Sequence, residues 1–528
     1  MTRHESLGPR SRRLIRAVLT GGGSRAGSLL VALLVTPILL QGLGFERYGI
    51  WALAGAAAGY LGLLDLGFGN GFVRFLARHA GQGDIDRFNG VMRTGIAVYA
   101  VIGAAIFPLI VLMAPSMAEM IGAGPGLRDE AVFLLIGVAA IFIFRSIFSV
   151  YRAALTAAER LDINNKLDLL ASVAGGLGAV VAVESGYGLT GLVVNGMAIA
   201  VLAVAAQMWA AYRVEPRIRI LPFRLDRESA RELFGYGLRV QGARLAEIVN
   251  GQADKIILGV MVSAASVGLY DLGMKVSLMA GVLPSLMLPA VLPASAILEA
   301  KGDSSALEEL HQRSIRYLAL LLAPGTAFVL VAASPILGFW IGREDLGQAS
   351  VAARLLVLGS APHLALGVSR LVARGIGAPT MEMRASLLMA GLNVVLSLAL
   401  VPILGPLGAP LGTCVAGIAG GLCFLVAFRK EVAGRFRLDP LRPLAAPAAA
   451  AAIAAIAGAA GLMSCAALQV QEGRAGDLAR LAATAVPFLA VYLLALRKLS
   501  PIDALDRRVA RETWLMARGS IGRTEAAP

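Results

Sequence analysis

The stretch Gly49-Ile50-Trp51-Ala52-Leu53 occurs a second time, in similar form, as Gly268-Leu269-Tyr270-Asp271-Leu272. The two copies begin 219 positions apart (268 − 49 = 219). Two further pairs keep this spacing, Gly23-Ser24-Arg25 with Gly242-Ala243-Arg244 and Gly83-Asp84 with Gly302-Asp303. A constant spacing over several anchors indicates a duplicated unit. Its length is that of a six-helix membrane half, and both copies run in the same direction.

The composition indicates a membrane protein. Of the 528 residues, 57% are hydrophobic and only 16% are charged, whereas soluble domains carry about 25% charged residues. Apolar runs of about 20 residues, the length that crosses a bilayer as a helix, recur along the whole chain. The alternating segments of about ten residues that are typical of a membrane β-barrel are not seen.

The sequence therefore predicts an all-α polytopic membrane protein with about 14 transmembrane helices, arranged as two pseudo-symmetric six-helix lobes plus two C-terminal helices. The predicted division is a six-helix lobe in residues 1–212, a basic linker in 213–232, a second six-helix lobe in 233–436, two further helices in 437–498 and a tail in 499–528. Two interruptions are expected. Gly21-Gly22-Gly23 breaks the first span early, and the segment after the second span is a loop that carries Arg74, Arg78, Arg87 and Arg93.

The formal net charge of +14 has two possible origins, nucleic-acid binding or membrane orientation. The basic residues gather in alternate loops, which is typical of the cytoplasmic loops of a membrane protein. One loop, from Glu299 to Arg316, has charges of mixed sign. We therefore expect both termini in the cytoplasm and no nucleic-acid partner. The three cysteines lie inside apolar segments and have no metal-binding or disulfide spacing.

The chain resembles the oligosaccharide flippases of the multidrug/oligosaccharidyl-lipid/polysaccharide exporter superfamily, the Wzx-type exporters of O-antigen and exopolysaccharide. The resembling stretches are Leu43-Gly44-Phe45-Glu46-Arg47-Tyr48-Gly49-Ile50-Trp51, Leu64-Asp65-Leu66-Gly67-Phe68-Gly69 followed by Arg74, Asp254-Lys255-Ile256-Ile257-Leu258-Gly259 and Val267-Gly268-Leu269-Tyr270. The likeness covers the first twelve spans, and its motifs identify the superfamily better than the substrate.

The resemblance implies two lobes around a central cavity that opens alternately to either side of the bacterial inner membrane. It implies a polyprenyl-diphosphate-linked oligosaccharide as substrate, membrane lipids as surroundings, and polysaccharide polymerase and assembly proteins as partners. A lipid II flippase and a multidrug cation antiporter are the alternatives within transport. A membrane enzyme would need a long outer loop with paired carboxylates, and the outer loops here are short.

Arg25 and Arg244 are the first candidate substrate-binding residues, because they are charged, lie inside spans and occupy equivalent positions in the two copies. Arg25 lies about 16 Å along its span, at 1.5 Å per residue. One interpretation is that both arginines bind the diphosphate, whose oxygens match the guanidinium. The other is that each pairs with a carboxylate or a helix C-terminus; Glu247 is placed to neutralise Arg244.

Two more charged or polar residues lie within spans of the predicted cavity. Arg145 is in the middle of the fourth span and His363 is in the tenth. We expect both to contribute to the cavity surface. For His363 the alternatives are a proton relay and a plain buried hydrogen bond.

The second copy also has charges that the first copy lacks. Asp254 aligns with Val35, and Asp271 and Lys275 align with Ala52 and Ala56. Asp271 and Lys275 have the acid-first i, i+4 spacing that favours a helical ion pair, within reach of Asp254 and Lys255. An outer gate, a coupling-ion carboxylate and a structural ion pair all remain open as interpretations. Near the other end of the membrane, Asp65 is placed to pair with Arg74, as a gate or as a structural contact.

Overall fold

The structure is a computed structural model, and it describes the chain from Pro9 to Leu499 apart from short gaps and one long one. The residues outside the description are 1–8, 66–67, 122–123, 125, 221–244, 286–287, 344, 433–435, 437, 470–472 and 500–528. In the described ranges every regular element is a helix. The prediction of an all-α protein is confirmed.

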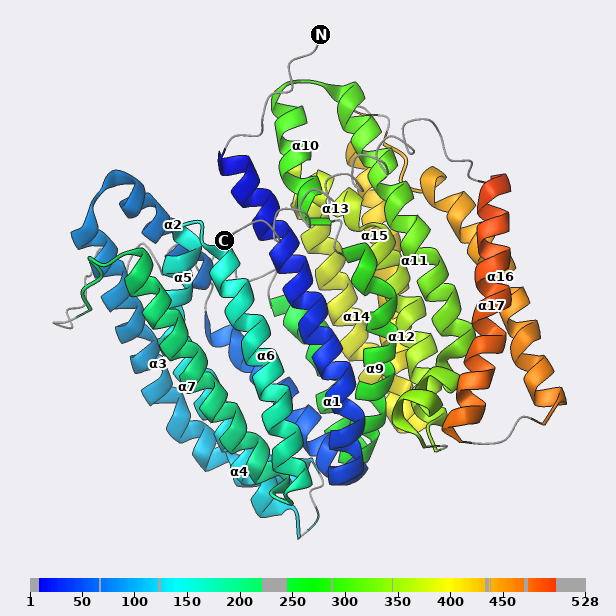
Figure 1. The fold of residues 1–528 in the computed structure, drawn as a ribbon, viewed down its shortest axis with the longest axis horizontal. Helices are drawn as coiled ribbons and strands as arrows, with labels where there is room; N and C mark the ends of the chain where they lie inside the picture. Colours follow the sequence, from blue (N-terminus) through cyan, green and yellow to red (C-terminus); the bar gives the residue numbers. More distant parts are fainter. Residues whose placement is uncertain are drawn as a thin grey trace, which may run out of the picture.

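The first lobe consists of helices that run up and down the bundle, in blue to green in Figure 1. Its elements are α1 (Pro9–Leu61), η1 (Gly62–Asp65), α2 (Phe68–Gln82), α3 (Ile85–Met120), α4 (Arg128–Ile147), α5 (Ser149–Ala157), α6 (Leu161–Glu184) and α7 (Gly188–Val214).

The second lobe follows the same order and ends in two extra helices. It begins with a helix over residues 245–261. Its other elements are α9 (Ala264–Ser285), η2 (Leu288–Ala290), α10 (Val291–Ala300), α11 (Ser304–Ile341), α12 (Gly347–Ala365), α13 (Gly367–Gly375), α14 (Thr380–Leu404), η3 (Gly405–Leu407) and α15 (Gly408–Val432). The extra helices are α16 (Arg442–Ala467) and α17 (Arg474–Leu499).

The helices have the length and apolarity of membrane spans. Among the described residues, eleven helical segments meet both criteria. Two of these, Gly21–Leu61 with 41 residues and Thr380–Val432 with 53, are long enough for two crossings each. The chain reverses at Gly44, whose φ of 75° lies in the left-handed region, and again at η3. This arrangement matches the predicted succession of spans.

Three local expectations were wrong. The stretch from Glu299 to Arg316, expected as a loop, lies on α10 and α11 apart from residues 301–303. The glycines at 21–23 do not interrupt α1, which is helical through them. The segment after the second span is not a loop, because Arg74 and Arg78 lie on α2 and Arg87 and Arg93 lie on α3. Only Gly83 and Asp84 separate these two helices, so the spans extend as helices beyond the apolar runs that the composition marks.

The duplication is visible in the backbone. Gly83 and Gly302 both have positive φ, 71° and 69°. The residues that follow them, Asp84 and Asp303, both cap the next helix by accepting a hydrogen bond from a backbone N–H three residues on. The fourth and tenth spans are also both divided, between α4 and α5 in one lobe and between α12 and α13 in the other. The local signals that end and restart helices are therefore shared by the two lobes.

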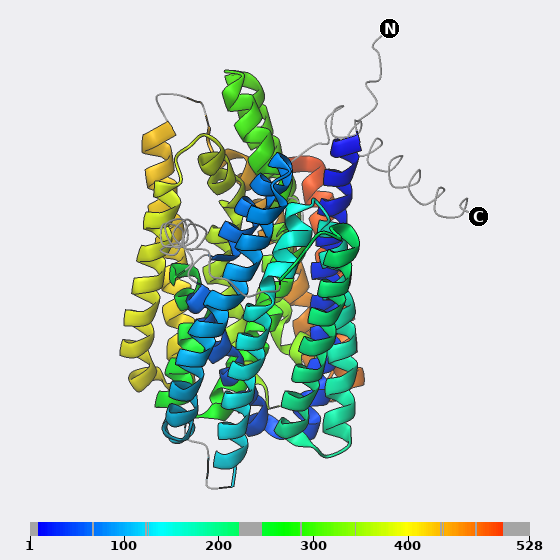
Figure 2. The ribbon, with the colours of Figure 1, turned by 90° about the vertical axis from the view of Figure 1, so that its left-hand side faces the viewer.

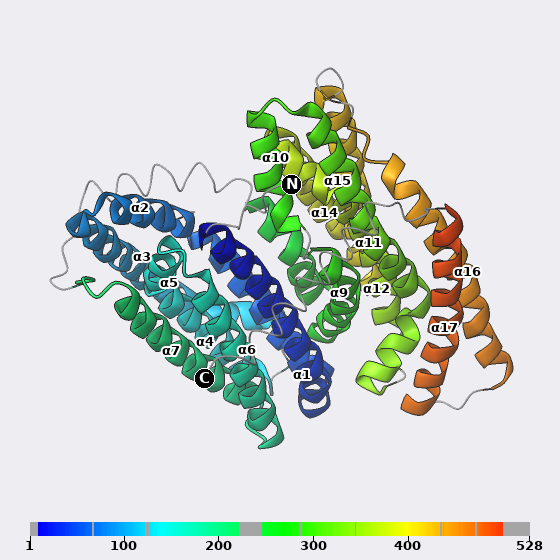
Figure 3. The ribbon, with the colours of Figure 1, turned by 45° about the horizontal axis from the view of Figure 1, so that its top comes forward.

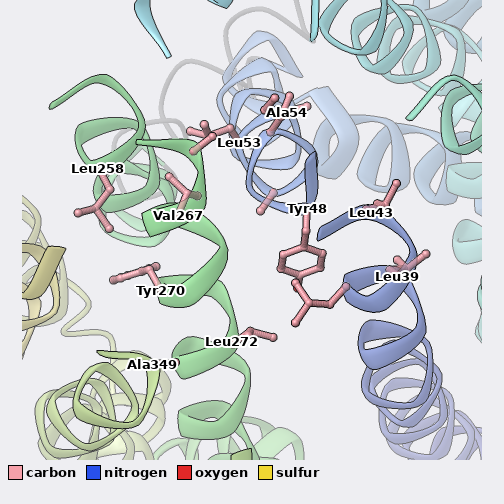
Figure 4. Close-up of a cluster of buried hydrophobic side chains, with 14 of the residues drawn as sticks. Leu39, Leu43, Tyr48, Leu53, Ala54, Leu258, Val267, Tyr270, Leu272 and Ala349 are labelled. Atoms are coloured by element: carbon pink, nitrogen blue, oxygen red, sulfur yellow. The ribbon is translucent and has the colours of Figure 1, made fainter. Parts of the chain in front are cut away.

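The two ends of the bundle differ in how the lobes meet. We call the end that holds α2 and α10, uppermost in Figure 1, the basic end, and the opposite end the Gly44 end. One buried apolar cluster at the Gly44 end draws on both lobes, with Leu39 and Tyr48 on one side and Leu258, Val267 and Leu272 on the other (Figure 4).

At the basic end each lobe has a core of its own. One buried cluster contains only residues between Phe68 and Ile218, and another contains only residues between Val291 and Leu438. Figure 3 shows the two lobes side by side, and Figure 2 shows the helices running along the long direction of the bundle. The lobes are thus joined at the Gly44 end and packed separately at the basic end.

The two extra helices belong to the second lobe. α16 and α17 pack on α11, on the side away from the first lobe (Figure 3). Tyr492 donates a hydrogen bond of 2.9 Å to the carbonyl of Leu320, and Arg474 donates one of 3.3 Å to the carbonyl of Ile341. These bonds attach both ends of α17 to α11.

Candidate functional site

The repeated sequence stretch forms the contact between the lobes. A Cβ on Gly49 of α1 would lie 1.7 Å from the carbonyl oxygen of Ala264, and one on Gly268 of α9 would lie 3.1 Å from that of Phe45. These two contacts are related by the duplication, because Gly49 aligns with Gly268 and Phe45 aligns with Ala264. Small residues allow helix backbones to approach closely, so the glycines of the motif set the distance between the lobes.

A polar cluster lies beside this contact and joins the lobes by side chains. We call Thr36, Tyr48, Lys255, Asp271 and Lys275 the interface cluster. Tyr48 donates a hydrogen bond of 2.6 Å to Asp271. Lys275 donates to the Tyr48 hydroxyl at 2.6 Å and to Thr36 at 3.0 Å. Thr36 and Tyr48 come from α1, whereas the charged members come from the second lobe.

The interface cluster contains two positive charges and one negative charge, and all three are largely buried. Asp271 forms ion pairs with Lys255 at 2.6 Å and with Lys275 at 3.0 Å, and the three side chains are 8%, 12% and 17% exposed. The pair predicted from the i, i+4 spacing is present, and Lys255 joins it. Two ammonium groups therefore share one carboxylate, and the Tyr48 and Trp51 rings face the second ammonium at 5.2 and 5.7 Å. Such a cluster depends on its geometry, because each buried charge needs its partner.

Asp254 belongs to a different cluster, although the sequence placed it within reach of Asp271. Its carboxylate accepts hydrogen bonds from Tyr270 at 2.6 Å, from Ser397 at 2.9 Å and from Thr413. The side-chain oxygen of Asn393 lies 3.2 Å from the Ser397 hydroxyl and 3.0 Å from the Thr413 hydroxyl. Asp254 is 1% exposed, so a group of neutral oxygen donors surrounds a buried carboxylate.

The second lobe contains a cavity of about 970 Å³ between the helix over 245–261, α9, α12, α14 and α15. Tyr270 and Thr413 of the Asp254 cluster line it at one end. Arg374 and Glu382 line it near the basic end, where they form a bidentate ion pair of 2.5 and 2.7 Å. The cavity therefore extends from the middle of the lobe toward the basic end, with both polar and apolar walls.

The structure separates two residues that the sequence assigned to one cavity. His363 lines the large cavity. Arg145 lines a smaller one of about 340 Å³ in the first lobe, together with Asp168, Ser172 and Asn195. Each lobe thus has its own polar cavity. His363 lines the cavity of the second lobe, and Arg145 lines that of the first.

Two further candidates that the structure describes, Arg25 and Arg74, do not line the large cavity. Arg25 is exposed on α1, one residue after Ser24, which donates a hydrogen bond to the carbonyl of Asn165. Arg74 is exposed on α2. Arg244 lies outside the described residues, and the Asp65 side chain is likewise outside them.

Comparison with known proteins assigns the chain to a family. A family model described as "Polysaccharide biosynthesis protein" matches residues 43–346, which is more than half of the chain. The chain belongs to the polysaccharide biosynthesis protein family. The match begins in the Leu43–Trp51 stretch and includes both copies of the repeated motif.

Several known proteins are similar to the chain in sequence or in fold. The "Probable flippase AglR" of Haloferax volcanii is 20% identical over 80% of this chain and 84% of its own length. A "Putative O-antigen transporter" of Shigella flexneri is 22% identical over 60% of this chain and 73% of its own length. The fold is that of the solved structure of "Lipid II flippase MurJ, inward closed conformation", with a TM-score of 0.71 and 13% identity over 92% of this chain and 99% of that one.

In this member of the polysaccharide biosynthesis protein family, three residues of the site were not predicted from the sequence. Thr36 and Tyr48 are neutral residues in an apolar span, and no local pattern distinguishes them from core residues. Arg370 was not among the candidates, yet it is 5% exposed and 2.6 Å from His363. The duplication itself contains the missing signal, because Arg370 is the counterpart of Arg152.

Proposed function

We propose that this protein is a flippase that carries a polyprenyl-diphosphate-linked oligosaccharide across the membrane for the biosynthesis of a cell-surface polysaccharide such as an O-antigen or exopolysaccharide. Membership of the polysaccharide biosynthesis protein family and the flippase and transporter names of its relatives support this function. Transport, rather than enzymatic chemistry, is the activity that these relatives are named for.

The main support for the proposal is that the cavity and the contact between the lobes lie toward opposite ends of the bundle. The cavity extends to the basic end, where the lobes have separate cores, while a shared core and the interface cluster join the lobes at the Gly44 end. A carrier that loads from one side needs this asymmetry. Separation of the lobes at the α1–α9 contact would reverse it and release the substrate at the Gly44 end, with the lipid tail remaining in the bilayer.

The proposed orientation places the basic end and both termini in the cytoplasm of a bacterial cell, with the protein in the inner membrane. The arginine-rich basic end supports it, because cytoplasmic loops carry an excess of Lys and Arg. In this orientation the substrate moves outward with its negative diphosphate. An inside-negative potential favours that direction by about 2.3 kcal/mol per charge per 100 mV.

The proposed substrate-binding residues are Arg25, Arg244, Arg145 and His363. Guanidinium groups suit a diphosphate because they donate paired, charge-assisted hydrogen bonds. His363 lines the second-lobe cavity and Arg145 lines the first-lobe cavity, so these two would contact a substrate held between the lobes. Arg25 and Arg244, related by the duplication, would bind the diphosphate from either lobe.

The proposed gate is the interface cluster. Asp271 and Lys275 make hydrogen bonds to Tyr48 and Thr36 across the lobe contact, so these bonds must break when the lobes separate. Asp254 is the proposed ion-coupling carboxylate, because a buried carboxylate among hydroxyl and amide oxygens suits a proton or a monovalent cation. Asp65 and Arg74 are proposed to act at the basic end, and polymerase and assembly proteins are the proposed partners.

The experiment uses the full-length protein in proteoliposomes with a labelled polyprenyl-diphosphate oligosaccharide in one leaflet. Wild type is expected to move the label to the other leaflet, and Arg25→Ala and Arg244→Ala are expected to lose most of this activity while remaining folded. Unchanged transport in both variants would remove them from the binding site. Failure of the wild type, combined with transport of cationic dyes, would contradict the flippase and favour an antiporter.

A further inference from the structure

The divided spans of the two lobes align residue by residue. α4 and α5 are separated by Phe148, and α12 and α13 are separated by Leu366. Arg152 is the fourth residue of α5 and Arg370 is the fourth of α13. In the same register Arg145 aligns with His363, each two residues before its helix ends. The duplication therefore left one arginine in the same place in both lobes.

The arginine of the first lobe has a carboxylate partner. Arg152 donates to both oxygens of Asp168, at 2.6 and 2.7 Å. Asp168 is the eighth residue of α6, and the eighth residue of α14 in the second lobe is Leu387. The second lobe thus has the arginine, but the position that corresponds to its carboxylate partner Asp168 holds the apolar Leu387.

Arg370 has other surroundings. One of its terminal nitrogens lies 2.6 Å from Nδ1 of His363, and its guanidinium lies over the Phe424 ring at 5.2 Å. It is 5% exposed, and its Nε has no hydrogen-bond partner among the described residues. Because arginine is always a donor, the imidazole is the acceptor, and it is therefore neutral. The positive charge remains buried, and none of the described carboxylates is bonded to it.

Glu382 and Glu247, the two carboxylates that line this part of the cavity, are not bonded to Arg370. Glu382 is held by Arg374 in the bidentate pair described above. Glu247 lines the same cavity and lies near Arg374. His363 lines the cavity in front of Arg370, so the imidazole stands between the buried guanidinium and the space that a substrate would enter.

We propose that Arg370 is the anion-binding residue of the second-lobe cavity, and that an acidic group of the substrate replaces His363 as its hydrogen-bond acceptor. A phosphate or carboxylate oxygen is a stronger acceptor for a guanidinium than a neutral imidazole, because the hydrogen bond is assisted by both charges. The planar fork can engage two oxygens of one group. The acidic group then takes the role that Asp168 has in the first lobe.

This inference rests on the proposed function and adds to it a residue and a ligand chemistry. The acidic group has two possible sources in a lipid-linked oligosaccharide, the diphosphate of the carrier or the carboxylate of an acidic sugar. Two substrates with the same polyprenyl diphosphate separate these sources, one with neutral sugars and one with a uronic acid.

The test measures the binding and flipping of both substrates by the full-length protein. Arg370→Gln is expected to weaken binding of at least one substrate by about tenfold or more, and Arg370→Lys by less. The matched control Arg152→Gln, which alters the paired arginine of the first lobe, is expected to change binding less than threefold. Loss for both substrates assigns the diphosphate, and loss for the uronic-acid substrate alone assigns the sugar carboxylate.

His363→Ala distinguishes binding from a structural role. His363 is itself a proposed cavity contact, but Arg370 stays available to the acidic group without it, so its removal is expected to weaken binding by less than about tenfold. Weakening by about tenfold or more would show a structural pair and overturn the proposal, and this arm decides even if Arg370→Gln does not fold. Wild-type binding with unchanged binding in Arg370→Gln would overturn this inference alone, whereas no wild-type binding of either substrate would overturn the proposed function as well.

Discussion

The two lobes share the features that form the fold and differ in the charges that join and line them. Gly83 and Gly302 turn the chain in the same way, and Asp84 and Asp303 cap equivalent helices. The interface cluster has no such symmetry: Lys255, Asp271 and Lys275 of the second lobe align with Thr36, Ala52 and Ala56 of the first.

This difference separates two kinds of constraint. Residues that both copies keep are those that a helix bundle needs for turns, caps and close approach. Residues that differ are buried charges, which cost stability unless each has its partner. A buried charge gained by one lobe alone is therefore a better guide to function than a shared glycine, and the second lobe is where we place the gate and the coupling site.

The largest effect is expected from breaking the charge cluster without replacing it. Asp271→Ala leaves two buried ammonium groups without their carboxylate, and we expect a loss of about 3–5 kcal/mol in the free energy of unfolding. Thermal unfolding in detergent measures it.

A triple variant sharpens the same comparison. Lys255→Thr/Asp271→Ala/Lys275→Ala gives the second lobe the residues that the first lobe already has. It is expected to recover most of the stability lost in Asp271→Ala, because no unpaired charge remains, while its transport stays altered. A triple variant as unstable as the single one would contradict the electrostatic explanation.

The second prediction concerns the contact that both lobes build. Gly49→Val places a side chain against the Ala264 carbonyl, so the closed Gly44 end becomes strained by about 1–3 kcal/mol, a typical cost of overpacking. That shifts the balance between the two open states by roughly 5- to 150-fold. Distances between spin labels on α2 and α10 are expected to shorten. Gly55→Val, on the same helix with no atom within 4 Å of the added Cβ, is the control that should leave them unchanged.

The third prediction concerns Asp254, whose counterpart Val35 is neutral. Asp254→Asn keeps the shape of the side chain and removes the carboxylate. We expect substrate still to bind, while the dependence of transport on a proton or sodium gradient is lost. Flipping assays with and without each gradient measure this. A variant that keeps the wild-type response to both gradients would exclude Asp254 as the coupling group.

The smallest effect is expected at the helix caps, where the lobes are alike. The backbone N–H of Ala306 holds the pKa of Asp303 below its usual value, so the cap stabilises the protein at neutral pH and loses this effect as the pH falls through the lowered pKa. Asp84→Ala and Asp303→Ala are expected to lower the melting temperature by about 2 °C or less each, and by similar amounts. A large difference between them would show that the caps are not equivalent.

The sequence predicted the fold because the fold depends on signals that repeat. Apolar length, the glycine turns and the offset between copies specify the spans and their order. The i, i+4 spacing also predicted the Asp271–Lys275 pair, since both residues lie on one helix. Tyr48 and Thr36 could not be predicted as its partners, because their contact depends on how α1 packs against α9. Asp254 was placed with the wrong neighbours for the same reason.

The central claim is that a lipid-linked oligosaccharide crosses by separation of the lobes at the Gly44 end. The Leu53 Cγ lies 3.3 Å from the position of a Cβ at Gly259, so a Leu53→Cys/Gly259→Cys pair on a background without the native cysteines can form a disulfide across this contact. Flipping of the labelled substrate in proteoliposomes is measured before oxidation, after it, and after reduction, with each single cysteine variant as a control. We predict transport that stops when the disulfide forms and returns when it is reduced. Transport that continues at the same rate with the disulfide formed would contradict the account.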